Sequence, residues 1–137
     1  MTIYANGVDI EGGGSSSSGG QITLATSGSA DGSEGAAWQT VGSRRLDPAD
    51  YSAVTWRFTA EGVSSGTTGE VRLYDATNDV AVVSLTMTAT DPADPNAVQS
   101  DTFDAPAVET QYLVQIRVPA TGSQSDSFTL TAAYLAV

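Results

Sequence analysis

The feature that most constrains the fold is a pattern of alternating side chains over residues 70–87. Its first half places Val71 and Leu73 on one face of a strand and Arg72 and Tyr74 on the other. A polar segment with the composition of a tight turn follows at 75–79, and the second half repeats the alternation with Ala81, Val83, Leu85 and Met87. Alternation with a period of two on both sides of a polar turn predicts a β-hairpin. Its apolar face must be buried against other strands.

The same alternation recurs along much of the chain. We expect one face of residues 53–60 to lie in the core, with Val54, Trp56, Phe58 and Ala60. A later segment shows the pattern in Tyr112, Val114, Ile116 and Val118. Phe128 and Leu130 are one step out of phase with the apolar residues after them, so we expect a β-bulge near Ala132.

Shorter segments complete the predicted order of elements. We expect short strands at 38–41 and 99–103, a loop at 26–35, and a polar connection at 43–51 that holds one helical turn at 47–50. The pattern contains no amphipathic helix of useful length. About eight strands with long, uneven connections predict an all-β fold, an antiparallel β-sandwich of jelly-roll type.

A run of glycine and serine divides the chain. Residues 12–20 have the composition of a flexible tether, so we expect an N-terminal arm with its tether over 1–20 and the sandwich domain over 21–137. Around the turn dipeptide Asn6-Gly7, the arm either extends or forms a small hairpin. We expect it to dock on a partner through its apolar residues, which are Ile3, Tyr4, Val8 and Ile10.

The composition excludes several classes of function. The chain has no Cys, His or Lys, which removes the usual nucleophile–base pairs and the commonest metal ligands, so we expect a protein that is not an enzyme. Sixteen acidic against five basic residues give a net charge of −11, which disfavours binding to nucleic acid. No apolar run approaches the ~20 residues that span a membrane, and no secretory signal is recognised at the start. All basic residues are Arg, which suits a GC-rich genome or a halophilic source equally.

Three sets of side chains are candidates for binding. Asp91, Asp94 and Asp101 surround a Pro-rich loop and could hold Ca²⁺ or another cation, although Asp is equally ordinary in turns. Trp38 is a candidate for stacking on a ligand. The outward-facing arginines, Arg72 and Arg117 among them, either pair with acidic residues or mark a subunit contact, where Arg is enriched.

Three segments together resemble small jelly-roll structural proteins of tailed viruses. They are residues 71–77 (VRLYDAT), 112–118 (YLVQIRV) and 132–137 (AAYLAV), in an order that recurs in such proteins. The likeness covers about residues 50–137. It implies a virion component such as a capsid decoration protein, turret or head fibre, usually oligomeric, and the acidic, Lys-free composition would suit a virus of a halophilic archaeon.

These observations lead to one expected function and one alternative. We expect a non-enzymatic virion protein that is made in the host cytoplasm and decorates the outer capsid surface, most simply as a homotrimer. Its partners would be the major capsid protein and further copies of itself, with Arg72 and Tyr74 adding to the contacts made by the arm. We expect no resident cofactor. The alternative is a carbohydrate-binding module that recognises a host glycan.

Overall fold

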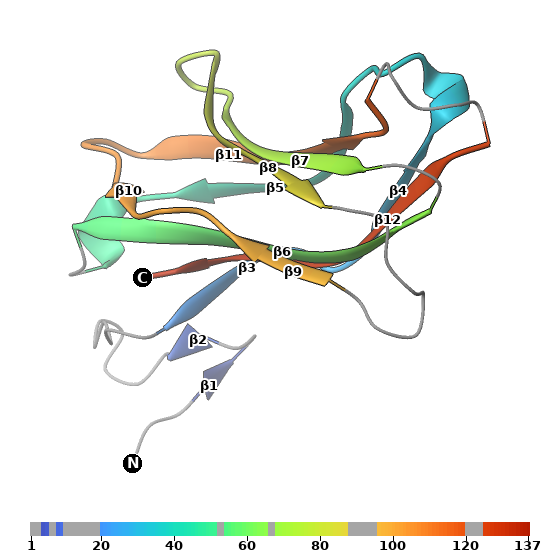
Figure 1. Ribbon diagram of the computed structural model, residues 1–137. Coiled ribbons are helices and arrows are strands. Elements are labelled where there is room, and N and C mark those ends of the chain that lie inside the picture. The colour runs from blue at the N-terminus through green and yellow to red at the C-terminus, as the bar shows by residue number, and fades with distance from the viewer. Residues whose placement is uncertain are drawn as a thin grey trace.

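Two antiparallel β-sheets stacked face to face make up the body of the protein, as a computed structural model shows (Figure 1). The structure describes residues 20–51, 54–65, 68–87, 96–119 and 125–137, and the backbone of two short strands at 4–5 and 8–9. The prediction of an all-β sandwich of jelly-roll type is confirmed. Among the described residues, no helix is long and apolar enough to cross a membrane.

The larger sheet is built around the last strand. β12 (Ser127–Ala136) pairs with β6 (Thr55–Ser65) on one side and, on the other, with β3 (Gln21–Ala25) and β4 (Gly28–Asp31). Beyond β6, this sheet ends at two short strands, β9 (Asn96–Gln99) and β10 (Phe103–Asp104). Strands that are far apart in sequence therefore lie side by side at its centre.

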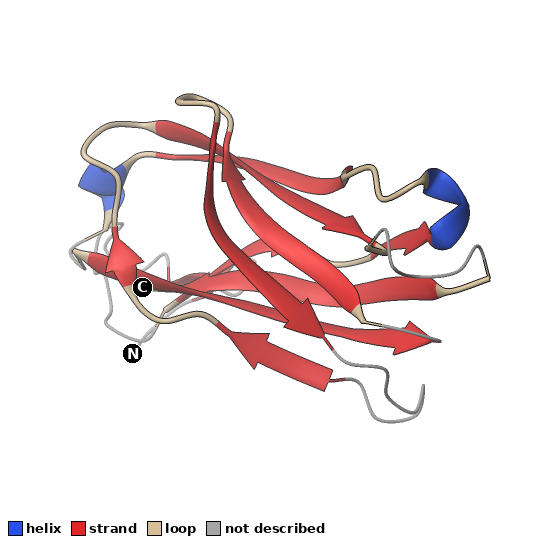
Figure 2. Ribbon diagram, turned by 45° about the horizontal axis from the view of Figure 1, so that its top comes forward, coloured by secondary structure: helices blue, strands red, loops and turns tan. Residues whose placement is uncertain are grey.

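The smaller sheet has the order β5–β11–β7–β8. Its strands are β5 (Gln39–Leu46), β7 (Gly69–Asp75), β8 (Val80–Met87) and β11 (Thr110–Arg117). The predicted hairpin forms its β7–β8 edge. Two short 3₁₀ helices, Gly32–Glu34 and Pro48–Asp50, lie in connections at opposite ends of the sandwich (Figure 2). The second is the helical turn expected at 47–50, and Asp47 caps it by accepting from the Ala49 N–H.

The core lies between the two sheets and follows the alternation of the sequence. Along β11 every second residue is buried and the residues between are half-exposed. The largest side chains without solvent exposure come from both sheets: Trp56, Phe58, Phe128, Ile22, Leu73, Met87, Ile116, Leu130 and Leu135. Each such side chain stabilises the fold by roughly 1.5–3 kcal/mol relative to exposure.

The expected bulge in β12 is confirmed, and a second one corrects the hairpin. Thr131 has no partner in the pairing with β6, because Leu130 lies opposite Gly62 and Ala132 opposite Glu61. This brings both halves of β12 into phase with the core. In the hairpin, Val82 is the extra residue, since Leu73 pairs with Val83 and Tyr74 with Ala81. Ala81 therefore lies opposite outward-facing Tyr74, and its predicted place on the core face is wrong.

Several other boundaries differ from the prediction. Val54 is 77% exposed because it precedes β6, although its carbonyl accepts from the Ala105 N–H. β5 continues to Leu46, into the segment predicted as a connection, because it pairs along the length of β11. Part of the expected 26–35 loop is strand β4, which pairs with β12. The strand predicted at 99–103 is divided between β9 and β10, which pair with different parts of β6.

The N-terminal arm contains a small hairpin, one of the two forms expected for it. β1 (Tyr4–Ala5) pairs with β2 (Val8–Asp9), and Tyr4 lies opposite Asp9. Ile3 and Ile10, which were predicted to dock with Tyr4 and Val8, lie outside the described residues.

Candidate functional site

The candidate site lies on the outer face of the β5–β11–β7–β8 sheet. Val71 and Leu73 point into the core, so the residues between and beside them on β7 point outward. The register places Gln115 of β11 opposite Arg72, and Arg117 opposite Glu70. Trp38 directly precedes β5, whose first residue pairs with Ile116. Outward-facing side chains from three segments thus gather at one place on the sheet.

Two arginines stack against the aromatic rings of this face. The Arg72 Cζ lies 4.3 Å from the centre of the Trp38 ring and 4.7 Å from the centre of the Tyr74 ring. The Arg117 Cζ lies 4.2 Å from the Trp38 ring. Cation–π contacts of this kind contribute about 0.5–1 kcal/mol at exposed sites and more where water is excluded. They hold all four side chains in a fixed arrangement.

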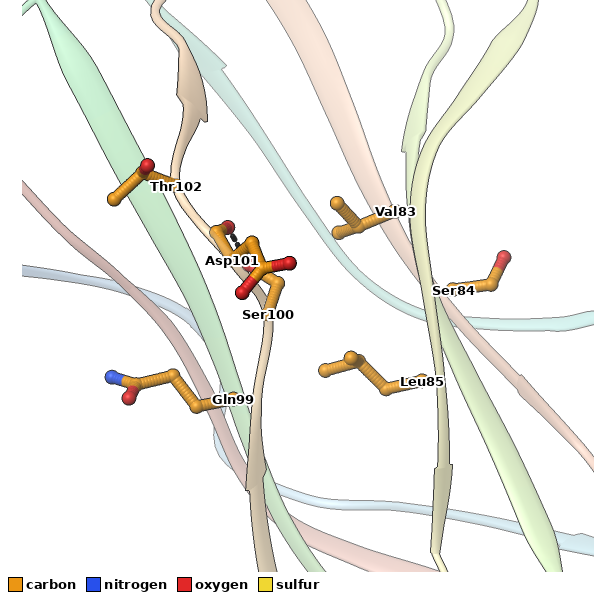
Figure 3. Close-up of a pocket in the computed structure, with 7 residues that line it drawn as sticks. All are labelled: Val83, Ser84, Leu85, Gln99, Ser100, Asp101 and Thr102. Atoms are coloured by element: carbon orange, nitrogen blue, oxygen red, sulfur yellow. Dashed lines mark hydrogen bonds between the residues drawn. The ribbon is translucent and has the colours of Figure 1, made fainter.

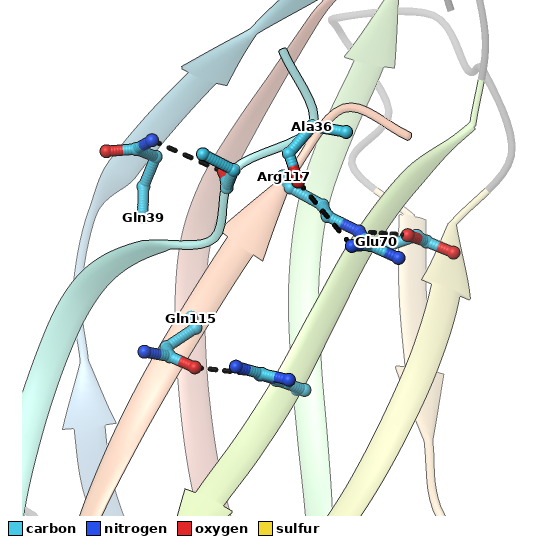
Figure 4. A network of polar contacts seen from close by, with 7 residues as sticks. Ala36, Gln39, Glu70, Gln115 and Arg117 are labelled. Carbon is cyan, nitrogen blue, oxygen red and sulfur yellow. Dashed lines mark hydrogen bonds and ion pairs between the residues drawn. The ribbon is translucent and has the colours of Figure 1, made fainter. Parts of the chain in front are cut away.

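Hydrogen bonds and an ion pair also hold the two arginine side chains in place. The Arg72 Nε donates to Gln115 Oε1 at 2.7 Å, and the Gln115 Nε2 donates to Thr40 Oγ1 at 3.1 Å. The Arg117 Nε donates to Glu70 Oε1 at 2.5 Å, and its Nη1 donates to the Ala36 carbonyl at 3.5 Å (Figure 4). Side chains held by two or more contacts lose little rotamer entropy when they bind a partner.

The charges of the two arginines are balanced differently. Arg117 forms an ion pair with Glu70, and the two side chains are 32% and 27% exposed. For Arg72, the described part of the chain offers an amide oxygen and two aromatic rings but no carboxylate. Burial, and then the nearby charge of Arg117, lower the pKa of Arg72 from its ordinary value. Arg72 is therefore a cation without an anionic partner among the described residues of a strongly acidic protein.

A second feature is a groove along the open side of the sandwich. It has a volume of about 380 Å³ and lies between β8 and the segment that joins β9 to β10. Figure 3 shows Val83 and Leu85 pointing across it toward the opposite segment, while Ser84 points away. Gln99, Asp101 and Thr102 supply the polar wall.

Of the aspartates considered for cation binding or for turns, some lie in described parts of the structure and others do not. Asp75 accepts from the Thr77 and Asn78 backbone N–H groups and from the Asn78 side-chain amide, so its carboxylate caps the β7–β8 turn. Asp101 lines the groove. Asp91 and Asp94, the other predicted cation ligands, lie outside the described residues. Within the described ranges, no three acidic side chains gather in an arrangement suited to a metal ion.

The structure brings together residues that the sequence treated as separate candidates. Trp38 was expected to stack on a ligand, and Arg72 and Tyr74 to contact a subunit, yet the three form one cluster. Sequence reasoning missed the part that Gln115 and Thr40 play in holding Arg72. The pairing register of β5 with β11 was the missing information, since it sets these side chains beside each other.

Comparison with known proteins finds structures of the same fold but no family to which the chain belongs. By sequence, the chain matches no protein family and no curated protein. Among solved structures, a chain of infectious bursal disease virus strain Gt is 15% identical with a TM-score of 0.55, covering 98% of this chain and 36% of that one. A carbohydrate-binding module, CBM36, in complex with calcium and xylotriose is 13% identical with a TM-score of 0.52, covering 83% of this chain and 96% of that one.

A third similar structure is also a carbohydrate-binding module. The CBM36-1 domain of a multidomain xylanase from the hindgut metagenome of Trinervitermes trinervoides is 10% identical with a TM-score of 0.52, covering 84% of this chain and 95% of that one. At such identities the likeness shows the β-sandwich fold alone. The fold is thus shared by viral and carbohydrate-binding proteins, and the chain spans about a third of the viral one.

Proposed function

We propose that this chain is a non-enzymatic structural protein of a virion, which decorates the outer capsid surface. The observation that carries the proposal is the outer sheet face, where Trp38, Arg72 and Tyr74 are held in a fixed arrangement. Trp, Tyr and Arg are the residues enriched where proteins recognise partners. The virion context is supported by the strand pattern of residues 71–137 and by the fold shared with the bursal disease virus chain.

The finer assignment concerns the virus and the mode of attachment. The strand pattern favours a tailed virus, and the acidic, Lys-free composition favours a halophilic host. In this proposal the arm docks on the major capsid protein or on a neighbouring subunit, and the sandwich projects outward. A small apolar arm binds weakly alone, but three tethered arms on a homotrimer multiply the effective affinity.

The test is a particle-binding assay with the full chain. Serine substitutions at Ile3, Tyr4, Val8 and Ile10 should leave the sandwich folded and abolish binding to stripped particles. A matched control carries serine at the exposed residues Val54 and Val108, which lie outside the arm. Mass spectrometry should find the chain in purified particles. Undiminished decoration by the arm variant would refute arm docking, and absence of the chain from particles would refute the virion assignment.

A second function is favoured by the same face and by the groove. A half-buried aromatic ring, here Trp38, beside amide and hydroxyl groups is an arrangement that sugars bind, which supports a carbohydrate-binding module. On that function, Trp38→Ala would abolish binding to a glycan and the protein would be a monomer. Sedimentation of the chain alone and with stripped particles distinguishes the two functions, because decoration requires an oligomer in solution or on the particle and a free binding module stays monomeric in both.

A further inference from the structure

We propose that Arg72, together with Trp38, Tyr74 and Arg117, forms a binding site for a saccharide that carries a carboxylate. The site is the outer face of the β5–β11–β7–β8 sheet around Arg72. The inference rests on the proposed role of this face in recognition, but it holds equally for a virion protein and for a free binding module.

The first argument is the uncompensated charge of Arg72. Its Nε is occupied by Gln115, and the two terminal nitrogens have no hydrogen-bond partner among the described residues. Guanidinium groups bind carboxylates through paired N–H donors, and such charge-assisted hydrogen bonds are about twice as strong as neutral ones. A carboxylate could accept from these terminal nitrogens, which the described residues leave unpaired.

The second argument is that the Arg72 side chain is preorganised for binding. Stacking on Trp38 and Tyr74 and the bond to Gln115 fix the Arg72 guanidinium before a ligand arrives. Arg117, whose charge is paired with Glu70, lies against the same Trp38 ring and so helps to fix the position of that ring. Partial burial and the nearby charge of Arg117 disfavour the charged form of Arg72, and an anion bound here would stabilise that form.

The third argument selects a saccharide over an acidic peptide. β7 and β11 are inner strands whose backbone groups are paired on both sides, so an extended peptide cannot add to the sheet here. Recognition must use side chains alone. Beside the guanidinium groups that lie on Trp38 and Tyr74, the exposed Thr40 hydroxyl accepts from Gln115 and keeps its proton for a sugar hydroxyl. A single sugar carboxylate avoids the repulsion that a larger acidic partner meets from a chain of charge −11.

The experiment compares the methyl glycoside of galacturonic acid, which carries one carboxylate, with its methyl ester, which has the same ring and no charge. NMR titration of the full chain should show the acid binding at least tenfold more tightly than the ester, with shifts at the Trp38 indole. Arg72→Gln should weaken binding of the acid at least tenfold and leave the ester unaffected. Arg72→Lys, which keeps the charge but loses the planar fork, should give an intermediate loss.

The matched control is Arg45→Gln, which removes the same charge from an exposed residue of β5 on the same sheet. It should bind like the parent chain. Equal affinity for acid and ester, unchanged binding by Arg72→Gln, or an equal loss in Arg45→Gln would overturn the proposal. Tighter binding of a hexa-glutamate peptide, or dissociation of an oligomer by Arg72→Gln, would overturn it in favour of a protein contact. Failure here would leave the arm-dependent particle binding unaffected, so the two proposals fail separately.

Discussion

Gly69 of β7 lies directly against the ring of Phe128 of β12, so this contact links the two sheets. A Cβ added at Gly69 would lie within 2.9 Å of the Phe128 Cβ and nearer still to its ring. Phe128 has no exposed surface and Gly69 is buried. The ring occupies the space that a side chain at position 69 would need.

Gly69→Ala is therefore expected to destabilise the fold. Overpacking of a filled core costs about 1–3 kcal/mol, because the ring or the strand must shift. Urea unfolding followed by tryptophan fluorescence measures the change. The double variant Gly69→Ala/Phe128→Leu should be more stable than the sum of the two single effects predicts, since the smaller side chain makes room for the methyl group. Strictly additive effects would show that the methyl group does not meet the ring.

Asp75→Ala is expected to destabilise the β7–β8 turn. It removes the acceptor of the Thr77 and Asn78 N–H groups, at a cost of about 1–3 kcal/mol. Asp75→Asn, which keeps one acceptor oxygen, should cost less. The same variants test the turn assignment against cation binding: addition of Ca²⁺ should not shift the melting temperature through this turn. A Ca²⁺-dependent shift in the parent chain that Asp75→Ala removes would contradict it.

Alkaline pH is expected to weaken the fold through Tyr112. Burial, and then the charge of Asp75, raise the pKa of Tyr112 from 10 to about 12. Between these values the unfolded chain has lost the phenol proton and the native chain retains it, so the free energy of unfolding falls as pH rises from 10 to 12. The loss approaches about 2 kcal/mol.

Tyr112→Phe should make this pH dependence shallower, as denaturant titrations at pH 8 and pH 11.5 would show. Some dependence should remain, because burial also raises the pKa of Tyr51. An unchanged slope in Tyr112→Phe would refute the assignment to Tyr112.

Deletion of Thr131 is expected to abolish folding. Without the bulge, the two halves of β12 cannot both keep their apolar residues on the core face, because a shift by one residue turns every following side chain over. Thr131→Ala, which keeps the residue and loses only the hydrogen bond to the Glu61 carbonyl, should remain folded. Circular dichroism and gel filtration distinguish the two results. A folded deletion variant would mean that β12 can shift its register.

Much of the sandwich could be predicted because alternation along a strand reports directly which face is buried. This held for β6, β7, β11 and the bulge in β12, where apolar residues recur at every second position. It failed where pairing rather than composition makes a strand. β4 contains only Gly28, Ser29, Ala30 and Asp31, and it is a strand because β12 lies beside it.

The sequence predicted only part of the candidate site on the outer sheet face. The outward phase of Arg72 and Tyr74 followed from the alternation, but their contact with Trp38 depends on how β5 pairs with β11. A register shift between Val114 and Gln115 sets that pairing, and nothing in the local sequence marks it. Long-range register therefore decided which separate candidates became one cluster.

The central place of β12 in the larger sheet has a consequence for the rate of folding. Ile22 pairs with Leu135 and Phe58 pairs with the same residue from the other side, so three widely separated parts of the chain must meet before this sheet exists. Contacts of such long range slow the search for the native state. During synthesis, the edges of β3 and β6 that pair with β12 stay unpaired until β12 has been made. Unpaired strand edges promote aggregation, so the nascent chain is most prone to aggregate during this interval.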